Sequence, residues 1–214
     1  VERAGQISNF QKEKYFNVEL DCDGIPAVKP KIFDPDEAEQ LRSRCQGSEA
    51  IVTAVKETEK KVKAPKLYDL TTLQREANRI YGMTAKQTLD TAQNLYEKKL
   101  ITYPRTDSQY LTEDMEQTAR NVVRQIYEKY QLTGPFDQPE QPDVKKVMNN
   151  SKVTDHHAII PTMELSSCHL DELKSWEEKI LFLIAVHTVM AMSKEHVYQE
   201  TEIEVECQGE IFKA

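Results

Sequence analysis

The sequence has few cysteines, and it has no long apolar segment. Its four cysteines, Cys22, Cys45, Cys168 and Cys207, stand far apart and form no C-x-x-C pair. This spacing argues against a structural zinc site and a disulfide framework, and it fits a reducing cytoplasm. No run of about 18 apolar residues occurs, and the N-terminal "VERAGQISNF" lacks the features of a secretory signal. We therefore expect a cytoplasmic protein without membrane association.

Positive charge is also scarce. The chain has 28 Lys and Arg residues against 36 Asp and Glu residues, a formal net charge of −8. Because phosphate binding needs local positive potential, the distribution of charge matters more than its total. Residues 56–87 carry eight cations and four acids, net +4, whereas residues 156–214 carry four cations and eleven acids, net −7. A basic face beside an acidic remainder is compatible with nucleic-acid binding, but a charge run is more often only a solvated face.

The length of 214 residues and the 39% hydrophobic content allow a substantial core. Apolar and polar residues alternate over residues 14–20 and 50–62, which predicts two strands with one exposed face each. Between them, Asp34 is a suitable N-cap for a short helix. Near Pro65 the spacing becomes helical, and alternation returns near Val197. We therefore predict an α+β fold in which a helical domain is inserted into a β-rich domain, with segments 1–14, 15–64, 65–193 and 194–214.

The helical part begins with two helices joined by a tight turn. Leu73, Ala77 and Ile80 recur at helical spacing, Gly82 ends this helix, and Thr84 begins the next. Such a pair can be a DNA-reading helix-turn-helix, but most pairs of this kind only pack in a core. On spacing alone we favour core packing.

Three more features follow along the chain. A helix is predicted from Thr112 to Tyr130, with apolar residues on one face. Residues 131–146 are rich in Pro and Gly and predict an irregular connection. The longest helical signal is apolar nearly all round from Ile180 to Met192, so we expect that helix to pass through the core.

The stretch "ITYPRTDS", residues 101–108, contains residues that can act on a phosphate. Pro104 biases Tyr103 toward an extended conformation. A phenol, with an ordinary pKa near 10, needs cationic neighbours to act as a nucleophile at neutral pH. Arg105 would lie on the same side of an extended chain and can bind phosphate oxygens in bidentate geometry. The alternative is a surface tyrosine in a proline turn with Arg105 paired to Asp107, which is the commoner outcome for such a short motif.

A second stretch, "DHHAIIPT", spans residues 155–162. The adjacent His156 and His157 point in different directions on any regular element, and no Glu or Cys stands at ligand spacing around them. We therefore expect one imidazole to bind a phosphate or move a proton while the other is structural. A histidine that only bonds a backbone carbonyl is an equal alternative. The other histidines show no comparable setting: His169, His187 and His196.

Residues 72–111 resemble the active-site region of the type IA DNA topoisomerases, whose pattern is Q-x-L-Y-E, a short spacer and I-T-Y-x-R-T-D-S. Here the first part is formed by Gln93, Leu95, Tyr96 and Glu97, and the second by residues 101–108. The stretch 155–162 resembles the family's histidine-containing motif. Pro104 and the "HHAIIPT" form resemble the topoisomerase III branch. The resemblance extends over the chain and is strongest from Leu67 to Thr162.

The resemblance implies roles for individual residues. Tyr103 is similar to the tyrosine that attacks a DNA phosphodiester, forming a 5′-phosphotyrosine link and freeing a 3′-hydroxyl. Arg105 matches the arginine that contacts the scissile phosphate, and His156 matches the histidine that contacts the phosphate or relays a proton. Further DNA contacts are expected from the rest of the motif and from the basic stretch: Thr106, Asp107, Ser108, Arg75, Arg79 and Lys86.

The resemblance also implies a larger enzyme. Its Mg²⁺ would be bound by Glu and Asp-x-Asp motifs of an N-terminal TOPRIM domain, which nothing here resembles, so we expect no metal in this chain. Residues 1–14 would end the domain after TOPRIM, residues 15–64 and 194–214 would form part of a β-rich arch, and residues 65–193 would be the tyrosine-bearing helical domain. The chain is thus expected to be a fragment that does not cleave DNA by itself.

The parent enzyme would act in bacteria near the nucleoid, on single-stranded or negatively supercoiled DNA and without ATP. The sequence identifies no helicase partner. Two other classes of function remain open. A non-catalytic helix-turn-helix module would bind DNA through the basic stretch and would not need Tyr103. A metal-dependent phosphohydrolase would use the histidines and would need a ligand cluster around them.

Overall fold

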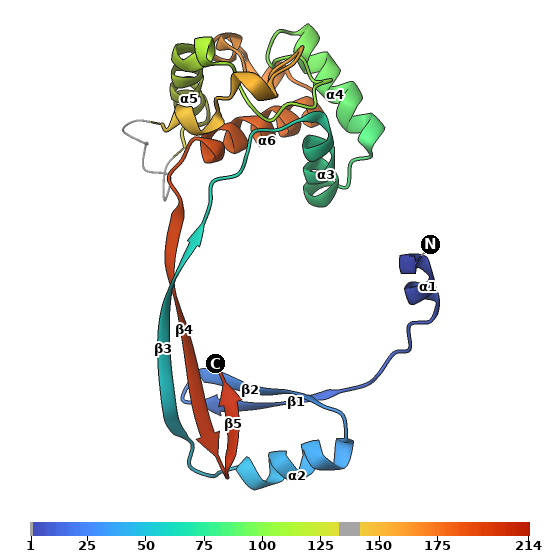
Figure 1. Cartoon of the computed structure of the whole chain (residues 1–214), viewed down its shortest axis with the longest axis vertical. Coiled ribbons are helices and arrows are strands. Elements are labelled where there is room, and N and C mark those ends of the chain that lie inside the picture. The colour runs from blue at the N-terminus through green and yellow to red at the C-terminus, as the bar shows by residue number, and fades with distance from the viewer. Residues whose placement is uncertain (1, 133–141) are drawn as a thin grey trace. The chain divides into compact units, whose positions relative to one another are not determined.

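The computed structural model describes residues 2–132 and 142–214 and divides the chain into two compact units (Figure 1). The first unit comprises residues 1–61 and 197–214, and the second comprises residues 62–196. A helical unit is therefore inserted between the two halves of a sheet-containing unit, which confirms the predicted α+β class. The sequence had predicted the divisions at 64/65 and 193/194.

The first unit is built on a five-stranded sheet in the order β1-β2-β5-β4-β3. Neighbouring strands run antiparallel in the pairs β1–β2, β2–β5 and β5–β4. Helix α2 packs against β1 and β2, and its buried residues join the sheet in a small core. The elements are α1 (Glu2–Ser8), β1 (Phe16–Cys22), β2 (Ile25–Ile32), α2 (Pro35–Cys45), β3 (Ile51–Val62), β4 (His196–Cys207) and β5 (Glu210–Lys213).

Strand β2 was not predicted from the sequence. Its Pro26 and Pro30 lack the N–H that a central strand needs, so the segment did not resemble a strand. Pro26 pairs with Asp21 in the ladder with β1, whereas the pairing with β5 contains only Val28 and Lys213 and neither proline. A tight turn with Gly24 at φ +89° connects β2 to β1, a backbone conformation that favours glycine.

Strand β3 corrects a second prediction. We expected one exposed and one covered face, but nearly all of β3 is exposed on both faces, including Ile51, Val52 and Val55. Helix α2 packs on β1 and β2, so its apolar residues cover those two strands and not β3. Strand β1 follows the prediction better, since Val18 is buried between exposed neighbours.

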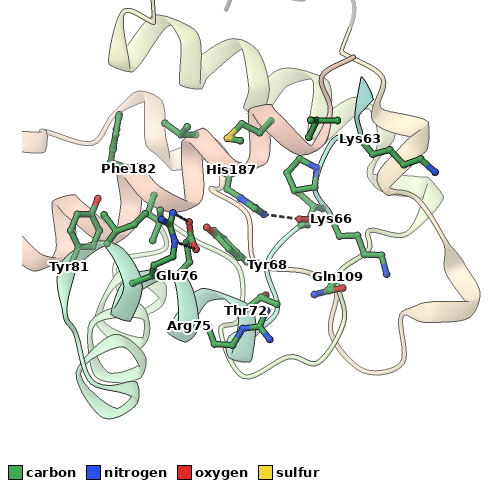
Figure 2. Close-up of a pocket in the computed structure, with 18 residues that line it drawn as sticks. Lys63, Lys66, Tyr68, Thr72, Arg75, Glu76, Tyr81, Gln109, Phe182 and His187 are labelled. Atoms are coloured by element: carbon green, nitrogen blue, oxygen red, sulfur yellow. Dashed lines mark hydrogen bonds and ion pairs between the residues drawn. The ribbon is translucent and has the colours of Figure 1, made fainter. Parts of the chain in front are cut away.

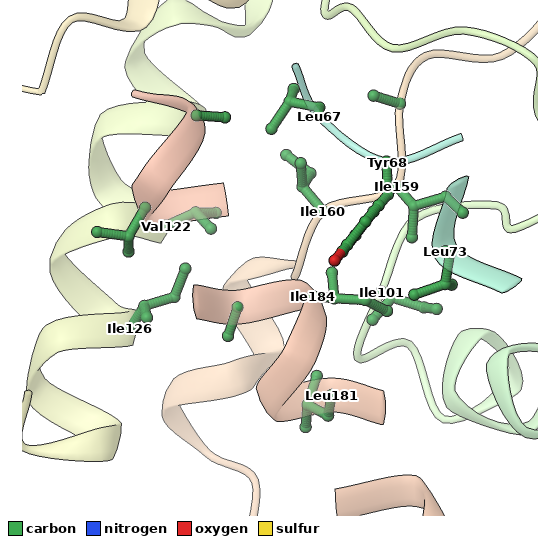
Figure 3. Packing of buried hydrophobic residues seen from close by; sticks show 14 of the residues in the cluster. Leu67, Tyr68, Leu73, Ile101, Val122, Ile126, Ile159, Ile160, Leu181 and Ile184 are labelled. Carbon is green, nitrogen blue, oxygen red and sulfur yellow. The ribbon is translucent and has the colours of Figure 1, made fainter. Parts of the chain in front are cut away.

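The second unit is formed by helices and short 3-10 turns around one large core (Figure 3). Helix α6 packs against α3, α4 and α5, and its Ile180, Leu181 and Ile184 are fully buried, which confirms that the longest apolar signal passes through the core. The helices are α3 (Leu70–Tyr81), α4 (Ala85–Glu97), α5 (Glu116–Tyr130) and α6 (Ser175–Ala191). None of the helices in the described ranges is both long and apolar enough to cross a membrane.

The helix pair α3 and α4 forms where the sequence predicts it. The Asp69 side chain accepts a bond from Thr72 N, and Gly82 ends α3 at φ +67°. Thr84 then caps α4 in a reciprocal pair with Gln87. Leu73 and Ala77 of α3 and Ala92 and Leu95 of α4 lie in the large core, in agreement with core packing, whereas Ile80 of α3 is exposed.

Helix α5 begins later than predicted. Thr112 makes no side-chain capping bond, and a 3-10 turn over Glu113–Met115 precedes the α-helix at Glu116. Of the predicted irregular connection, residues 133–141 lie outside the described residues, and Val144–Val147 form a 3-10 turn.

A buried carboxylate links the end of α4 to the beginning of α6. Glu177 is 2% exposed, and its Oε2 accepts bonds from Lys98 Nζ at 2.6 Å and from Lys174 N at 3.1 Å. Burial opposes ionisation of Glu177, but these two bonds outweigh it and the pKa of the carboxyl is lowered. The ion pair lies just before the stretch that carries Tyr103 and holds that end of α4 in place.

We predict that Glu177→Gln lowers the free energy of unfolding by about 1–3 kcal/mol near neutral pH, because Lys98 loses its anionic partner. A lowered folded-state pKa means that the stabilisation is present above the ordinary value of 4.5 and is lost as the pH falls through the lowered value. Urea unfolding at neutral and acidic pH should show the difference from wild type shrinking on acidification. The exposed neighbour Glu178 supplies the control Glu178→Gln, and an equal loss in both variants would contradict the prediction.

Candidate functional site

The two motif-bearing stretches lie side by side in the second unit although about fifty residues separate them. Ile101 bridges to Pro161, and Thr102 N donates to Ile160 O at 3.0 Å. Ile101 and Ile160 are each 1% exposed and belong to the large core (Figure 3). Core packing therefore holds the two stretches next to one another. The polar residues of the motifs follow Ile101 in one stretch and precede Ile160 in the other.

This arrangement brings the predicted nucleophile and one imidazole together. The rings of Tyr103 and His156 have centroids 4.4 Å apart, and Tyr96 packs edge-on against Tyr103 at 5.3 Å. Tyr103 is half-buried, whereas His156 is exposed and open to a ligand. His157 instead has its Nδ1 3.0 Å from Ala158 O, which fits the structural role left open for one of the two histidines.

Arg105 is exposed beside this pair. The predicted extended strand is wrong beyond Ile101, because the chain bends at Pro104 and Arg105. In the described part of the chain Arg105 forms no ion pair, so the alternative in which it pairs with Asp107 is not the arrangement found. Its guanidinium is therefore available to an anion such as a phosphate.

Thr106 and Ser108 are buried, and their hydroxyls are used inside the protein. Thr106 Oγ1 donates to His156 O at 3.0 Å and accepts a bond from Ser108 N at 3.1 Å. Ser108 Oγ donates to Lys152 O at 2.9 Å. These bonds position the two stretches, and the burial does not support the predicted contacts of Thr106 and Ser108 with DNA. Asp107, by contrast, is exposed.

Thr102 is a positioning residue that sequence reasoning missed. Its Oγ1 donates to Ala158 O at 2.9 Å and accepts a bond from Ile160 N at 3.0 Å. The hydroxyl thus bonds a backbone carbonyl and a backbone N–H that would otherwise pair with the backbone of the other stretch. Its place in the motif beside Tyr103 was the available signal, but its partners become visible only in three dimensions.

The predicted basic contacts differ in how they are paired. Arg79 bonds Glu76 at 2.6 Å, and that bond lowers the pKa of the Glu76 carboxyl. Lys86 bonds Asp90 at 2.6 Å. Arg75 is exposed and forms no ion pair with any residue in the described ranges. All three remain predicted DNA contacts, with Arg75 the most available cation.

Two lysines missed by the sequence analysis add positive charge near the site. The Lys152 and Lys66 ammonium groups lie 5.0 and 5.6 Å from the centre of the Tyr110 ring. Tyr110 belongs to the same stretch as Tyr103, and its carbonyl accepts a bond from Ala158 N at 2.9 Å. Local positive potential therefore exists in this acidic chain.

His187 also has a defined setting that the sequence did not indicate. Its ring stacks on Tyr68 with centroids 3.7 Å apart and planes 11° apart, and its Nε2 donates to Lys66 O at 2.7 Å (Figure 2). Burial lowers the pKa of His187, so the imidazole is neutral near physiological pH. The pair forms one wall of a pocket that has a volume of about 850 Å³.

Within the described ranges, no three His, Cys, Asp or Glu side chains come together as a metal site. The phosphohydrolase considered for the histidines therefore has no ligand set there.

We predict that Thr106→Val lowers the free energy of unfolding by about 1–3 kcal/mol, because His156 O and Ser108 N lose their shared partner. Thr106→Ser keeps the hydroxyl and should cost about 1 kcal/mol or less, the contribution of one buried methyl group. Denaturant unfolding of the two variants tests this. Equal losses would mean that the hydroxyl bonds do not hold the two stretches together.

Comparison with known proteins identifies the family of the chain. The family described as DNA topoisomerase matches residues 1–214. DNA topoisomerase 3 of Bacillus subtilis is 35% identical over 224 residues, and that of Bacillus licheniformis is 36% identical over 229 residues. Both alignments cover 100% of this chain and 30% of the relative, so the chain spans about a third of the length of these proteins.

The fold agrees as well. The solved structure of full-length topoisomerase I from Thermotoga maritima matches with a TM-score of 0.72 and 27% sequence identity, over 100% of this chain and 35% of that one. Sequence, fold and the arrangement of the two motifs lead to one conclusion. The chain belongs to the type IA DNA topoisomerases, in the topoisomerase III branch.

Proposed function

We propose that this chain is the tyrosine-bearing part of an enzyme that cleaves and rejoins one DNA strand. The observation that carries the proposal is the 4.4 Å juxtaposition of the Tyr103 and His156 rings, beside an Arg105 that is exposed and outside any ion pair of the described residues. A nucleophile and an imidazole are thus in contact in the helical unit, and an exposed guanidinium stands two residues after the nucleophile. Family membership makes DNA the expected substrate.

The proposed step is a transesterification. The Tyr103 oxygen loses its proton and attacks the phosphorus of a phosphodiester, and the bond to the 3′-oxygen breaks as the bond to Tyr103 forms. The 3′-oxygen takes up a proton and leaves as a hydroxyl, while the 5′-phosphate stays on Tyr103. Because one ester replaces another, the reverse attack reseals the strand without ATP.

Arg105 and His156 have distinct parts in this proposal. The Arg105 guanidinium would bind two non-bridging phosphate oxygens and stabilise the charge that develops on them. The His156 imidazole would bond a phosphate oxygen or carry the transferred proton. Thr102 and Thr106 act indirectly, by holding the backbone on which Tyr103 and His156 are presented.

The substrate in this proposal is single-stranded or negatively supercoiled DNA, in which a strand can reach a half-buried tyrosine. Magnesium is part of the proposal through the family, and it would be held by segments that this chain does not contain. We propose that the chain alone, without those segments, does not cleave DNA.

We expect the full-length protein to form a covalent adduct with single-stranded DNA at Tyr103, through a 5′-phosphate. Tyr103→Phe should abolish both the adduct and relaxation of supercoiled DNA, since the attacking oxygen is gone. The measurement is denaturant trapping with Mg²⁺ and labelled DNA, followed by peptide mapping by mass spectrometry. Tyr15→Phe, an exposed tyrosine of the other unit, is the control. Relaxation that persists in Tyr103→Phe would leave only a DNA-binding helical module.

Arg105→Ala should lower the rate of cleavage about 100-fold or more, the usual effect of removing one group that stabilises transition-state charge. Arg105→Lys should recover only part of this rate, because an ammonium cannot bind two oxygens in the geometry of a guanidinium. Single-turnover cleavage at saturating DNA measures the effect. Arg124→Ala on α5 is the matched control, and equal rates for Arg105→Ala and Arg124→Ala would exclude the proposed role.

A further inference from the structure

The pocket of about 850 Å³ on the helical unit has an apolar surface that the fold leaves uncovered. Phe182, Val186 and Met190 are spaced four residues apart on α6 and line one side of it. Phe182 is 41% exposed and Met190 is 39% exposed, and Ile80 of α3, 44% exposed, faces the same pocket. Large apolar side chains that gather around one hollow mark a binding surface rather than chance exposure.

The same pocket is also lined by cations. Lys63, Lys66, Arg75 and Arg79 line the pocket together with one acid, Glu76. Arg79 and Glu76 neutralise each other, so the other three leave a local charge of about +3 in a chain whose total is −8. The ligand of the pocket should therefore combine negative charge with apolar or aromatic surface.

The two properties occupy different parts of the pocket. Figure 2 shows Phe182 and Tyr81 at one end, and Lys63, Lys66 and Gln109 at the other. The wall between them is rigid, because the stacked pair of Tyr68 and His187 is held by the bond to the Lys66 carbonyl. A ligand with a flat ring at one end and an anionic group at the other, such as a nucleotide, would place each group beside the residues that can bind it.

The pocket adjoins the stretch that carries Tyr103. Leu70 N donates to Thr106 O at 3.0 Å, which fixes the beginning of α3 against that stretch. Gln109 lines the pocket and lies only six residues after Tyr103. The segment from Tyr103 to Gln109 therefore connects the site to the pocket.

We propose that this pocket holds an unstacked base and the adjoining phosphates of the DNA strand on which Tyr103 acts, which rests on the proposed function. Phe182 and Tyr81 provide stacking surface, and Lys63, Lys66 and Arg75 bind phosphates without reading sequence. The pocket volume lies in the range of about 300–1,000 Å³ that holds small organic ligands. The pocket is therefore a second point of attachment, separate from the scissile phosphate.

Photocross-linking of the full-length protein tests the position of the strand. Single-stranded oligonucleotides carry a photoreactive base at successive positions from the cleavage site, and mass spectrometry maps the cross-linked residues. We expect one narrow set of positions to cross-link to Phe182, Tyr81 or Met190. The same sequence as a duplex should give no cross-link there, because its bases are stacked. Absence of pocket cross-links from every position of the single strand would overturn the proposal.

Affinity measurements give an independent test. Phe182→Ala and Arg75→Gln should each weaken binding of single-stranded DNA about 5- to 100-fold, the range expected for loss of one stacking contact or one phosphate contact. Phe182→Leu keeps the apolar volume without the ring and should weaken binding as well. Trp176→Ala and Arg124→Gln, an exposed aromatic residue of α6 and an exposed arginine of α5 that do not line the pocket, should bind as wild type.

The outcomes separate this proposal from the proposed function. If the pocket holds DNA, Phe182→Ala still forms the Tyr103 adduct at saturating DNA and requires more DNA to do so. Unchanged affinity in both pocket variants, with an intact Tyr103 adduct, would exclude the pocket and leave the function standing. Loss of affinity in the pocket variants, with no adduct at Tyr103 in the wild type, would support the pocket as a DNA site and reject the transesterification.

Discussion

The site depends on the hydrogen bonds that join two stretches far apart in the sequence. Thr102 and Thr106 extend hydroxyl bonds from the tyrosine stretch to backbone atoms of the histidine stretch, and Ile101 and Ile160 anchor both in the core. Without these contacts, nothing would hold the rings of Tyr103 and His156 next to one another. Both types of contact are needed, since apolar burial supplies most of the energy while the hydroxyl bonds fix the register.

The net charge of the whole chain differs from the local charge around Tyr110 and the pocket. The chain is acidic overall, yet Lys66 and Lys152 lie over the Tyr110 ring, and Lys63, Lys66 and Arg75 line the pocket. Acids neutralise Arg79 and Lys86 within their own helices, whereas Arg75 and Arg105 stay available. A count along the sequence detects the basic stretch, but only the contacts show which of its members can bind a phosphate.

The helices were predicted well because their signals are local. Asp69, Gly82 and Thr84 mark the ends of α3 and α4 through bonds to backbone atoms within a few residues. The strands were predicted less well because a strand depends on its neighbours. Strand β2 holds two prolines, which do not predict a strand, and β3 is exposed nearly throughout although the sequence predicts one covered face.

The sequence by itself determined which reactive side chains stand close together in the chain and which segments are helical. The reactive side chains are Tyr103 and Arg105 around Pro104, and the pair of histidines. Tertiary structure alone decided that the His156 ring contacts the Tyr103 ring, that Thr106 and Ser108 face inward, and that His187 stacks on Tyr68 at a pocket. The physical reason is distance along the chain. Motifs and caps act over a few residues, whereas burial and ring contacts are made between residues that only the folded core brings together.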